Sequence, residues 1–349
     1  MQQRLVDEWY RVPAGVSPLQ PLAWLYGLVV SLRRWLYVRG WLPTLHAGRP
    51  LIVVGNITVG GTGKTPLVAW LAQRLSSSGL KVGIVSRGYG RRDRGVRTVS
   101  SDSRWEEVGD EPLLLHRLTG CDTVVARDRV AGARALAARG ADVIVADDGL
   151  QHLRLARDCE VVVIDGARGL GNGRVLPAGP LREPSGRLRD VELLVMNGPP
   201  EHASLSAAGG MPKQALFQMT LWGEEAHRLD GQGAPLPLER FRGQRVHAVA
   251  GIGNPERFFR GLRQRGIDVV EHAFADHHPF VVSDLDFADG LPVLMTEKDA
   301  VKCRELADTH LWYIPVVTRF SAEQAKDLLD AIARRLGPLR EPQPTSGDE

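Results

Sequence analysis

Cysteine is scarce in this chain, and the few cysteines are far apart. Only Cys121, Cys159 and Cys303 occur among 349 residues, with no C-x-x-C pair. This spacing excludes a disulfide framework and a cysteine-rich zinc site, and it is typical of a cytosolic chain. A composition of 43% hydrophobic and 24% charged residues also excludes a disordered chain.

Acidic residues are missing from a long stretch near the N-terminus. None occurs between Glu8 and Asp93, so residues 1–92 hold twelve Lys and Arg against two acidic residues. The formal charge of this stretch is therefore +10, whereas that of the remaining chain is −7. The imbalance indicates an anionic partner for the N-terminal region. Nucleic acid is not the expected partner, because no nucleic-acid-binding motif accompanies the basic residues.

No apolar run near the N-terminus is long enough to cross a bilayer. The run from Leu22 to Leu32 contains Ser31 and is followed by Arg33 and Arg34, well short of the roughly 20 apolar residues that a spanning helix requires. Seven of the thirteen Trp and Tyr residues fall within the first 41 positions. Aromatic residues interleaved with arginine are typical of a segment at a membrane interface.

Residues 20–34 are expected to form a helix that is apolar around most of its circumference. Gln20, Gly27, Ser31 and Arg34 would lie on one narrow polar stripe. Such a helix must be covered either by protein, as a core helix under the main sheet, or by lipid. The arginines and aromatic residues favour peripheral contact with a membrane.

From residue 51 onwards, short apolar runs alternate with helical stretches, as at 51–54, 82–85, 143–145, 161–164 and 193–196. Fully apolar strands separated by helices predict a parallel α/β sheet that is covered on both faces. Residues 215–221 resemble one isolated strand, and a second α/β pattern starts after Arg245. The predicted division is a membrane-associating helix in 1–42, a P-loop domain in 43–222, a smaller α/β domain in 223–336 that closes the cleft, and a disordered tail in 337–349.

A glycine-rich segment follows the first predicted strand and precedes a helix. It matches a P-loop, in which backbone N–H groups and the helix N-terminus bind phosphate, Lys64 reaches the β- and γ-phosphates and Thr65 ligates Mg²⁺. Thr58 stands where the strict pattern has glycine, and a glycine-rich turn without a ligand is the alternative. The expected nucleotide-binding residues are Thr58, Val59, Gly60, Gly61, Thr62, Gly63, Lys64 and Thr65.

A P-loop needs a second carboxylate for Mg²⁺ at the end of a neighbouring strand. Asp147 and Asp148 follow the apolar run 143–145 in the form of a Walker B motif. We expect Asp147 to be the better-placed Mg²⁺ ligand, with Asp148 holding metal-bound water or its neighbour. The alternative is an acidic pair that caps a turn.

Two further segments offer groups for proton transfer. Asp110 stands at the predicted start of a helix, where it could act as a base or only as a helix cap. His277 and His278 lie in the second domain, from which an imidazole could reach across a cleft.

The order of these motifs resembles one known family. The segments 55–66 (GNITVGGTGKTP), 86–91 (SRGYGR), 109–112 (GDEP), 147–152 (DDGLQH), 176–183 (LPAGPLRE), 276–277 (DH) and 296–300 (TEKDA) occur in this order. Together they are similar to the tetraacyldisaccharide 4′-kinases, the lipid A 4′-kinases of Gram-negative bacteria.

The resemblance implies an ATP-dependent kinase that phosphorylates the 4′-hydroxyl of tetraacyldisaccharide 1-phosphate, giving lipid IVA. It implies peripheral association with the cytoplasmic face of the inner membrane and no obligate protein partner. It assigns Asp110 as the base, paired with His277, and Mg²⁺ to Thr65, Asp147, Asp148 and Glu111. The implied candidates for the lipid substrate or phosphate site are Arg87, Tyr89, His152, Arg182 and Glu183.

A function of another class shares the P-loop and the basic helix. A membrane-docked P-loop ATPase that switches a partner protein would need both, but it would not need the second domain with His277. A guanine-nucleotide switch is disfavoured, because Lys298 stands one place too late for the [NT]-K-x-D motif.

Overall fold

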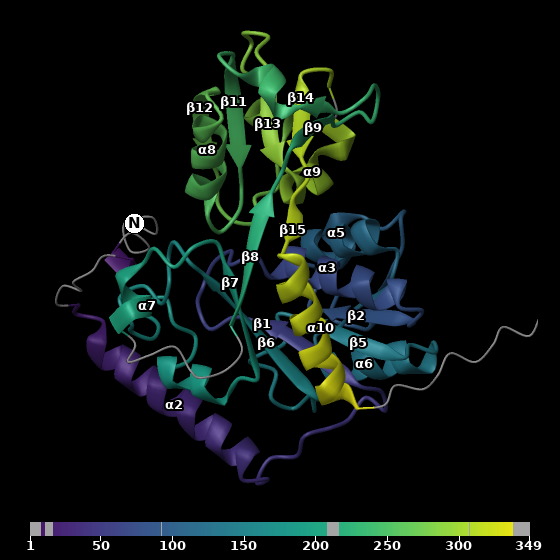
Figure 1. Ribbon diagram of the computed structural model, residues 1–349, viewed down its shortest axis with the longest axis vertical. Coiled ribbons are helices and arrows are strands. Elements are labelled where there is room, and N and C mark those ends of the chain that lie inside the picture. Colours follow the sequence, from purple (N-terminus) through teal and green to yellow (C-terminus); the bar gives the residue numbers. More distant parts are fainter. Residues whose placement is uncertain (1–7, 11–16, 92, 208–215, 307, 338–349) are drawn as a thin grey trace, which may run out of the picture.

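The computed structural model describes residues 8–10, 17–91, 93–207, 216–306 and 308–337. The expected tail beyond residue 337 and parts of the first 16 residues lie outside this set. The described residues form two sheets with their helices, the larger at the bottom and the smaller at the top of Figure 1.

The larger sheet has nine strands among the described residues, in the order β15-β8-β7-β6-β1-β5-β2-β4-β3. Neighbouring strands are parallel except at the two edges, where β15 and β3 run antiparallel to their neighbours. The strands are β1 (Leu51–Gly55), β2 (Val82–Ser86), β3 (Arg97–Val99), β4 (Asp122–Val125), β5 (Val143–Asp147), β6 (Cys159–Asp165), β7 (Leu193–Asn197), β8 (Leu216–Trp222) and β15 (Val317–Arg319).

Helices cover both faces of the larger sheet. On one face the apolar side chains of α3 and α10 pack against the strands, and on the other α6 does so. This arrangement confirms the predicted parallel sheet flanked by helices. The helices around this sheet are α3 (Lys64–Ser77), α4 (Trp105–Val108), α5 (Asp110–Thr119), α6 (Arg129–Ala138), α7 (Ala203–Ala207), α10 (Ala322–Leu336) and a 3-10 turn at Ser185–Asp190.

The smaller sheet has the order β10-β9-β14-β13-β11-β12, and its last four strands are parallel. Its core lies against α8 and α9. The strands are β9 (Glu225–Arg228), β10 (Leu236–Pro237), β11 (Arg245–Ala250), β12 (Asp268–Ala273), β13 (Val293–Thr296) and β14 (Leu311–Ile314). The helices are α8 (Pro255–Gln264), α9 (Glu297–Cys303) and 3-10 turns at Leu238–Phe241, Val282–Asp284 and Arg304–Leu306.

The chain crosses between the sheets twice, from β8 to β9 and back from β14 to β15 (Figure 1). The run at 215–221 is therefore not an isolated strand, since β8 lies between β15 and β7 in the larger sheet and pairs with both. Residues 317–336 also differ from the predicted division, because β15 and α10 belong to the larger sheet. Leu328 and Ile332 of α10 are buried in the core of that sheet, so hydrophobic packing decides the assignment.

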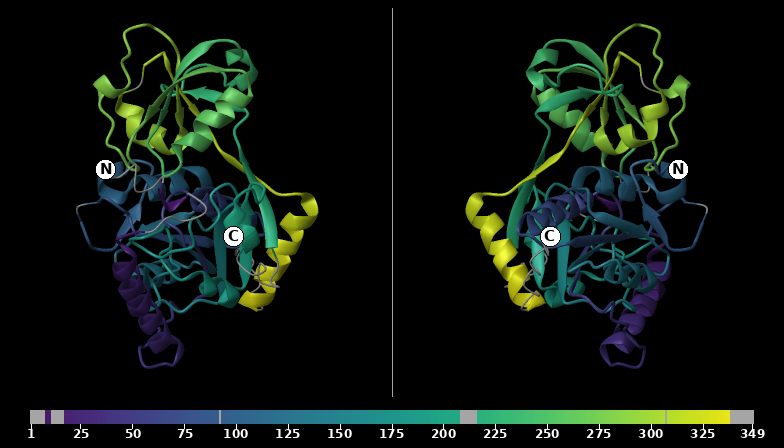
Figure 2. Two further views of the ribbon diagram at one scale, coloured as in Figure 1. Left: turned by 90° about the vertical axis from the view of Figure 1, so that its left-hand side faces the viewer. Right: turned by 90° about the vertical axis from the view of Figure 1, so that its right-hand side faces the viewer.

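The N-terminal helix α2 (Gln20–Val38) lies on the outside of the larger sheet, on the side opposite α10 (Figure 2). Among its residues only Ala23 is fully buried. The alternative of a core helix under the sheet is thus excluded. None of the described helices has the length and apolar character needed to span a membrane.

Candidate functional site

The phosphate loop joins β1 to α3, whose first two residues are Lys64 and Thr65. Gly63 has φ +96°, and a Cβ there would lie 2.6 Å from the Asn197 side-chain nitrogen, so the turn requires glycine. That same nitrogen donates to the Thr62 carbonyl at 2.9 Å. The loop is thereby held from β7 as well as by its own backbone.

Thr58, the departure from the strict P-loop pattern, is buried and forms an antiparallel bridge with Leu181. The next residue, Val59, donates its backbone N–H to the Pro180 carbonyl at 2.8 Å. This end of the loop adopts extended pairing with residues 180–181, which a side chain tolerates. Gly60 and Gly63, both with positive φ, supply the turns closer to Lys64.

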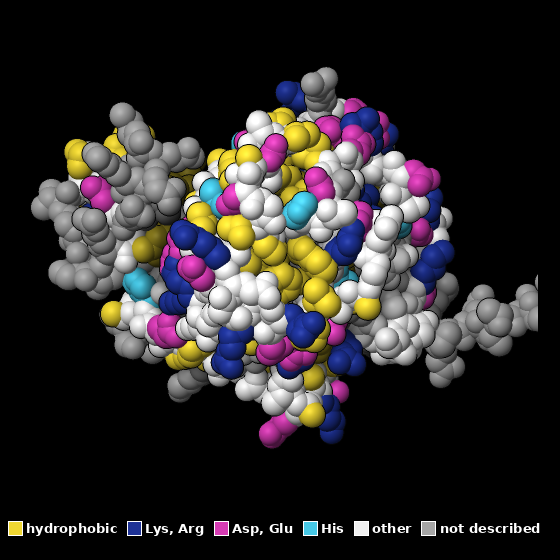
Figure 3. All heavy atoms as spheres, turned by 90° about the horizontal axis from the view of Figure 1, so that it is seen from above, with side chains coloured by type: hydrophobic (Ala, Val, Ile, Leu, Met, Phe, Trp, Pro, Cys, Tyr) yellow, Lys and Arg dark blue, Asp and Glu magenta, His cyan; other side chains and the backbone are white. Residues whose placement is uncertain are grey.

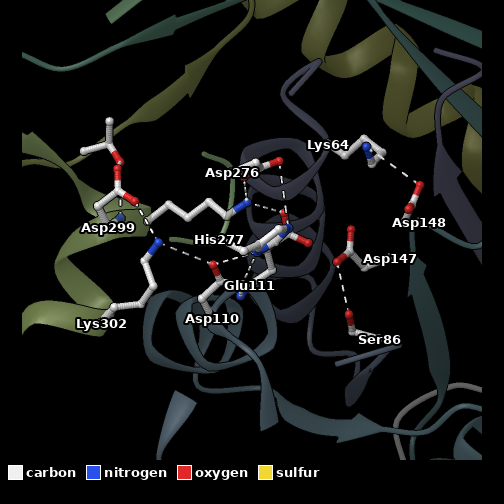
Figure 4. Close-up of polar contacts among 12 residues, drawn as sticks. Lys64, Ser86, Asp110, Glu111, Asp147, Asp148, Asp276, His277, Asp299 and Lys302 are labelled. Carbon is white, nitrogen blue, oxygen red and sulfur yellow. Dashed lines mark hydrogen bonds and ion pairs between the residues drawn. The ribbon is translucent and has the colours of Figure 1, made fainter. Parts of the chain in front are cut away.

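The two predicted metal carboxylates stand beside the phosphate loop because β5 is the direct neighbour of β1. Asp148 Oδ1 lies 3.7 Å from Lys64 Nζ, and Arg182 donates to both Asp148 oxygens at 3.0 Å. Asp147 accepts a hydrogen bond from Ser86 at 3.3 Å (Figure 4). Lys64, Asp147, Asp148 and the phosphate loop thus lie together at the carboxyl ends of the neighbouring strands β1 and β5.

The environments of the two carboxylates differ. Burial, reinforced by the negative charges of Glu111 and Asp148, raises the pKa of Asp147 to about 7. Burial also opposes ionisation of Asp148, but Lys64 and Arg182 outweigh it and lower the pKa of that group to about 2. A cation beside Asp147 would relieve the crowding of negative charge, which is the property expected of a metal-binding carboxylate.

Among the described residues, no group of three or more His, Cys, Asp and Glu side chains is arranged to hold a metal by itself. Mg²⁺ in phosphate sites is usually held by one or two carboxylates together with the phosphates. Asp147 with Thr65 fits that smaller donor set.

Asp110 and His277 meet across the boundary between the two sheets. His277 Nδ1 lies 2.9 Å from Asp110 Oδ2 and 3.0 Å from Oδ1 (Figure 4). Asp110 is the first residue of α5 and is buried, whereas Gly109 is the helix cap. His277 has φ +63°, an unusual conformation for a residue other than glycine. His278 hydrogen-bonds Asp284 instead, at 2.9 Å.

The charges around this pair keep Asp110 ionised. Burial would raise the pKa of Asp110, but the hydrogen bond from His277 and the charge of Lys298 outweigh it and lower that pKa to about 2. Burial lowers the pKa of His277, but the bond to Asp110 prevails and raises it. The pair is therefore a carboxylate with an imidazole that tends to be protonated.

Lys298 of α9 joins the same cluster from the smaller sheet. Its Nζ lies 2.9 Å from Glu111 and 3.0 Å from Asp276. Burial disfavours its charge, but Glu111 and Asp110 more than compensate and raise the pKa of Lys298. Glu111, expected near Mg²⁺, is thus bound to a lysine in this arrangement.

The other predicted site residues differ in their exposure and in the groups they contact. Tyr89 is exposed, and its ring lies 4.8 Å from that of His277. Arg87 is exposed beside it, whereas Glu183 is buried and accepts from Gln151 at 2.9 Å. Burial and Arg129 lower the pKa of His152 to about 4, so this imidazole is neutral at pH 7. Arg182 has the ion pair with Asp148 described above.

Several residues of the site were not predicted from the sequence. Arg129 is buried and donates to the Asp147 carbonyl at 3.0 Å. The Gly253 carbonyl accepts from Arg168 at 2.7 Å, and a Cβ on Gly253 would lie 2.3 Å from the Gly61 nitrogen. Arg129 sits at a helix start among other basic residues, and nothing in its local pattern distinguishes it. The contact of Gly253 with the loop depends on how the two sheets meet.

Comparison with known proteins identifies similar chains of one family. The family model described as Tetraacyldisaccharide-1-P 4′-kinase matches residues 16–334. Tetraacyldisaccharide 4′-kinase of Xanthomonas euvesicatoria pv. vesicatoria is 50% identical over 328 residues, covering 93% of this chain and 94% of the relative. The protein of that name from Aromatoleum aromaticum is 50% identical over 326 residues, covering 93% and 96%.

A solved structure is similar as well. The crystal structure of the "apo" form of LpxK from Aquifex aeolicus, in complex with ATP, superposes with a TM-score of 0.74 at 31% identity. The match covers 91% of this chain and 98% of that one. Sequence, site geometry and fold lead to one assignment: the chain belongs to the tetraacyldisaccharide 4′-kinase family.

Proposed function

We propose that this protein transfers the γ-phosphoryl group of ATP to the 4′-hydroxyl of tetraacyldisaccharide 1-phosphate and so forms lipid IVA. The observation that carries the proposal is the contact of Asp110 with His277 across the two sheets, next to the phosphate loop and its carboxylates. A kinase needs a nucleotide site and an acceptor-activating group on facing walls. A nucleotide-driven switch has no use for the second of these.

The nucleotide phosphates would bind the backbone N–H groups between Gly60 and Thr65 and the N-terminus of α3, with Lys64 on the β- and γ-phosphates. The N–H of Val59 is already bonded to the Pro180 carbonyl, so Thr58 and Val59 would hold the shape of the loop.

Thr65 and Asp147 would hold Mg²⁺, and Glu111 and Asp148, whose negative charges act on Asp147, would favour a cation there. Bound Mg²⁺ would neutralise the negative charge of the phosphates.

Asp110 would accept the proton of the attacking 4′-hydroxyl. A group with a pKa of about 2 is a weak base, but phosphoryl transfer has a loose transition state in which the proton leaves late. Position then matters more than basicity. His277, held at 2.9 Å, would orient the carboxylate, and Lys64 would neutralise the transferred group.

The sugar-phosphate part of the substrate would meet side chains around this point. Tyr89, beside His277, would offer a ring face to the sugar, and Arg87, two residues earlier in the chain, is also exposed. Arg182 would complete the wall next to Asp148, and the buried Glu183 would support it through Gln151, which is hydrogen-bonded to both. His152 would serve as a neutral hydrogen-bonding group, since its pKa is about 4.

The acyl chains require an apolar surface, and α2 offers one. Its outward side exposes large apolar side chains, and its less exposed side holds Gly27 near Val175 and Arg34 paired with Asp190 at 3.0 Å. The Tyr26 hydroxyl donates to the Arg182 carbonyl at 3.0 Å, which links the helix to the site. The exposed apolar residues are Leu22, Trp24, Leu25, Leu28, Val29, Leu32, Trp35, Val38 and Trp41.

An apolar helix face flanked by exposed Arg33 and Arg39 fits peripheral binding to an anionic membrane. We therefore place the protein at the cytoplasmic face of the inner membrane, with α2 in the lipid interface. The opposite end of the molecule, seen from above in Figure 3, has basic and acidic side chains intermixed. That end is expected to face the cytosol.

The test is a transfer assay that also measures hydrolysis. The full-length protein is incubated with Mg-ATP labelled at the γ-phosphate and tetraacyldisaccharide 1-phosphate in detergent micelles. Label in the lipid, with little inorganic phosphate released without acceptor, is expected. Phosphate release with no labelled lipid would instead favour the ATPase switch.

A further inference from the structure

A fully buried ion pair beside the proposed base has no part in the mechanism described so far. Lys302 Nζ lies 2.9 Å from Asp299 Oδ1, and their side chains are 1% and 0% exposed. Burying two charges costs free energy that their mutual attraction often does not recover. A pair of this kind at an active-site boundary therefore calls for an explanation other than stability.

Lys302 faces Asp110 from the opposite sheet. Its Nζ lies 3.9 Å from Asp110 Oδ2, and both side chains are buried (Figure 4). Asp110 opens α5 of the larger sheet, whereas Lys302 is on α9 of the smaller one. The ammonium group therefore lies beside the base only when the two sheets are in contact.

Asp299 is connected through the backbone to His277, the hydrogen-bond partner of Asp110. Its Oδ2 accepts from the Gly251 N–H at 2.9 Å and from the Thr296 hydroxyl at 2.6 Å. The carbonyl of Gly251 in turn accepts from the backbone N–H of His277 at 3.3 Å. His277 is held at a positive φ, which needs support from its surroundings.

We propose that Lys302 and Asp299 are a positioning pair that fixes Asp110 and His277 relative to each other, and that they determine turnover rather than nucleotide affinity. The inference rests on the proposed kinase function. The polar contacts of the pair run to Asp110, Gly251 and Thr296, and Lys302 Nζ also lies 4.9 Å from the centre of the Phe280 ring. None of these residues belongs to the phosphate loop. Neither residue touches the reacting atoms in this account.

The variant must remove the ammonium without leaving a buried charge. Lys302→Met alone would strand the Asp299 carboxylate, which is strongly destabilising. Combining it with Asp299→Asn removes both charges at nearly constant volume. The amide oxygen at position 299 can still accept from Gly251 and Thr296. A loss of activity in this variant therefore reports the contact of Lys302 with Asp110.

A matched control perturbs the same helix without reaching Asp110. Cys303, next to Lys302, is fully buried in the core of the smaller sheet. Cys303→Ala removes core packing from α9 and is expected to lower the melting temperature while kcat stays within twofold of the wild type. It separates general loosening of α9 from loss of the positioning contact.

The measurements are kcat and KM with the lipid acceptor and the dissociation constant of a fluorescent ATP analogue, all on the full chain. For the double variant we expect kcat to fall about 10–100-fold, as for a small misplacement of reacting groups. Nucleotide affinity should stay within threefold of the wild type. An unchanged kcat, or an equal loss of nucleotide affinity, would overturn the inference.

A second test asks whether the double variant acts through His277, by comparing its effect in the wild type and in His277→Ala. If the pair acts through Asp110 and His277, the double variant should cost less than threefold in a His277→Ala background. A full additional 10-fold loss there would contradict the proposal. A wild-type protein that transfers no phosphate would overturn the proposed function itself, a result distinct from an active wild type with an equally active variant.

Discussion

The proposed chemistry depends on where single side chains are placed by the backbone. Asp110 lies at the boundary between the two sheets because α5 begins there. Gly109, which has φ +92°, is the cap of this helix. His277 approaches from the loop after β12 in a left-handed conformation. Their contact is a property of two residues that are 167 positions apart in the chain.

Replacing Asp110 with asparagine tests its role directly. Asp110→Asn keeps the shape and removes the proton acceptor, so kcat should fall about 10²–10⁴-fold. Affinity for an ATP analogue, measured by fluorescence titration, should change little. Asp122→Asn is the control, since that carboxylate pairs with Arg139 at the surface and marks the start of β4. Full activity of Asp110→Asn would remove the base from the mechanism.

Glu297 predicts a pH-dependent stability. Burial raises its pKa from the ordinary 4.5 to about 7, while its carboxylate accepts from the Val316 N–H at 3.3 Å. The folded state therefore binds more protons than the unfolded state between these values, so this group lowers stability as pH rises from 4.5 to 7.

The variant Glu297→Gln should remove this effect. At pH 8 it should be more stable than the wild type by up to about 3 kcal/mol, with little difference at pH 4.5. Melting temperatures at the two pH values provide the measurement. A gain that is equal at both would show that ionisation of Glu297 is not its source.

At the scale of elements, α2 combines an exposed apolar side with a protein-facing stripe. The sequence predicted this helix and its stripe, because period and charge are local properties. Gln20, Gly27 and Arg34 are partly buried, as are Tyr26 and Val30, whereas Ser31 is exposed. The protein-facing side therefore contains apolar residues as well as the predicted polar ones. The sequence could not decide what covers the apolar side, since that depends on the position of the larger sheet.

Changing the exposed leucines of α2 tests the proposed membrane contact. Leu25, Leu28 and Leu32 are 52–66% exposed, so their joint replacement by Gln should leave folding intact. Binding to vesicles of phosphatidylglycerol and phosphatidylethanolamine should weaken at least about 10-fold, because each leucine contributes roughly 1–3 kcal/mol when buried in lipid.

The same change at Val281 and Val282 is the control. These valines are also exposed, but they lie on the smaller-sheet part of the molecule. Their replacement by Gln should leave vesicle binding unaltered in a flotation assay. Equal effects of the two sets, or none from the leucines, would argue against α2 as the membrane contact.

Across the whole molecule, the site exists only where the two sheets meet. The P-loop, Asp147 and Asp148 were predictable because strand, turn and helix follow one another in sequence. The partner of Asp110 was assigned by resemblance, and the structure brings His277 to it. Lys302, Gly253 and Arg129 were not predictable, because each acts through a contact set by tertiary packing.

The boundary between the two parts of the chain was likewise not fully predictable from the sequence. Residues 317–336 follow the smaller-sheet pattern in sequence but return to the larger sheet, where Leu328 and Ile332 are buried. Pro315 stands between β14 and β15, at the point where a single apolar run changes sheets. Local hydrophobicity predicts a strand at each place but not the sheet to which it belongs.

The close approach of the sheets at the phosphate loop can be tested with one methyl group. A Cβ on Gly253 would lie 2.3 Å from the Gly61 nitrogen, so Gly253→Ala must push the sheets apart. We expect kcat/KM for ATP to fall about 10-fold or more. Gly261→Ala, on α8 with open space around it, should leave steady-state kinetics unchanged. Normal activity of Gly253→Ala would show that this contact is dispensable.

In the proposed reaction the phosphate goes to one particular hydroxyl of the lipid. The most direct measurement is to purify the product formed by the full-length protein from Mg-ATP and tetraacyldisaccharide 1-phosphate and to record ³¹P–¹H correlations. Transfer to the 4′-hydroxyl should give a new phosphomonoester coupled to the proton at the 4′ carbon, absent with Asp110→Asn. Unmodified lipid alongside hydrolysed ATP, or phosphate on another position, would contradict it.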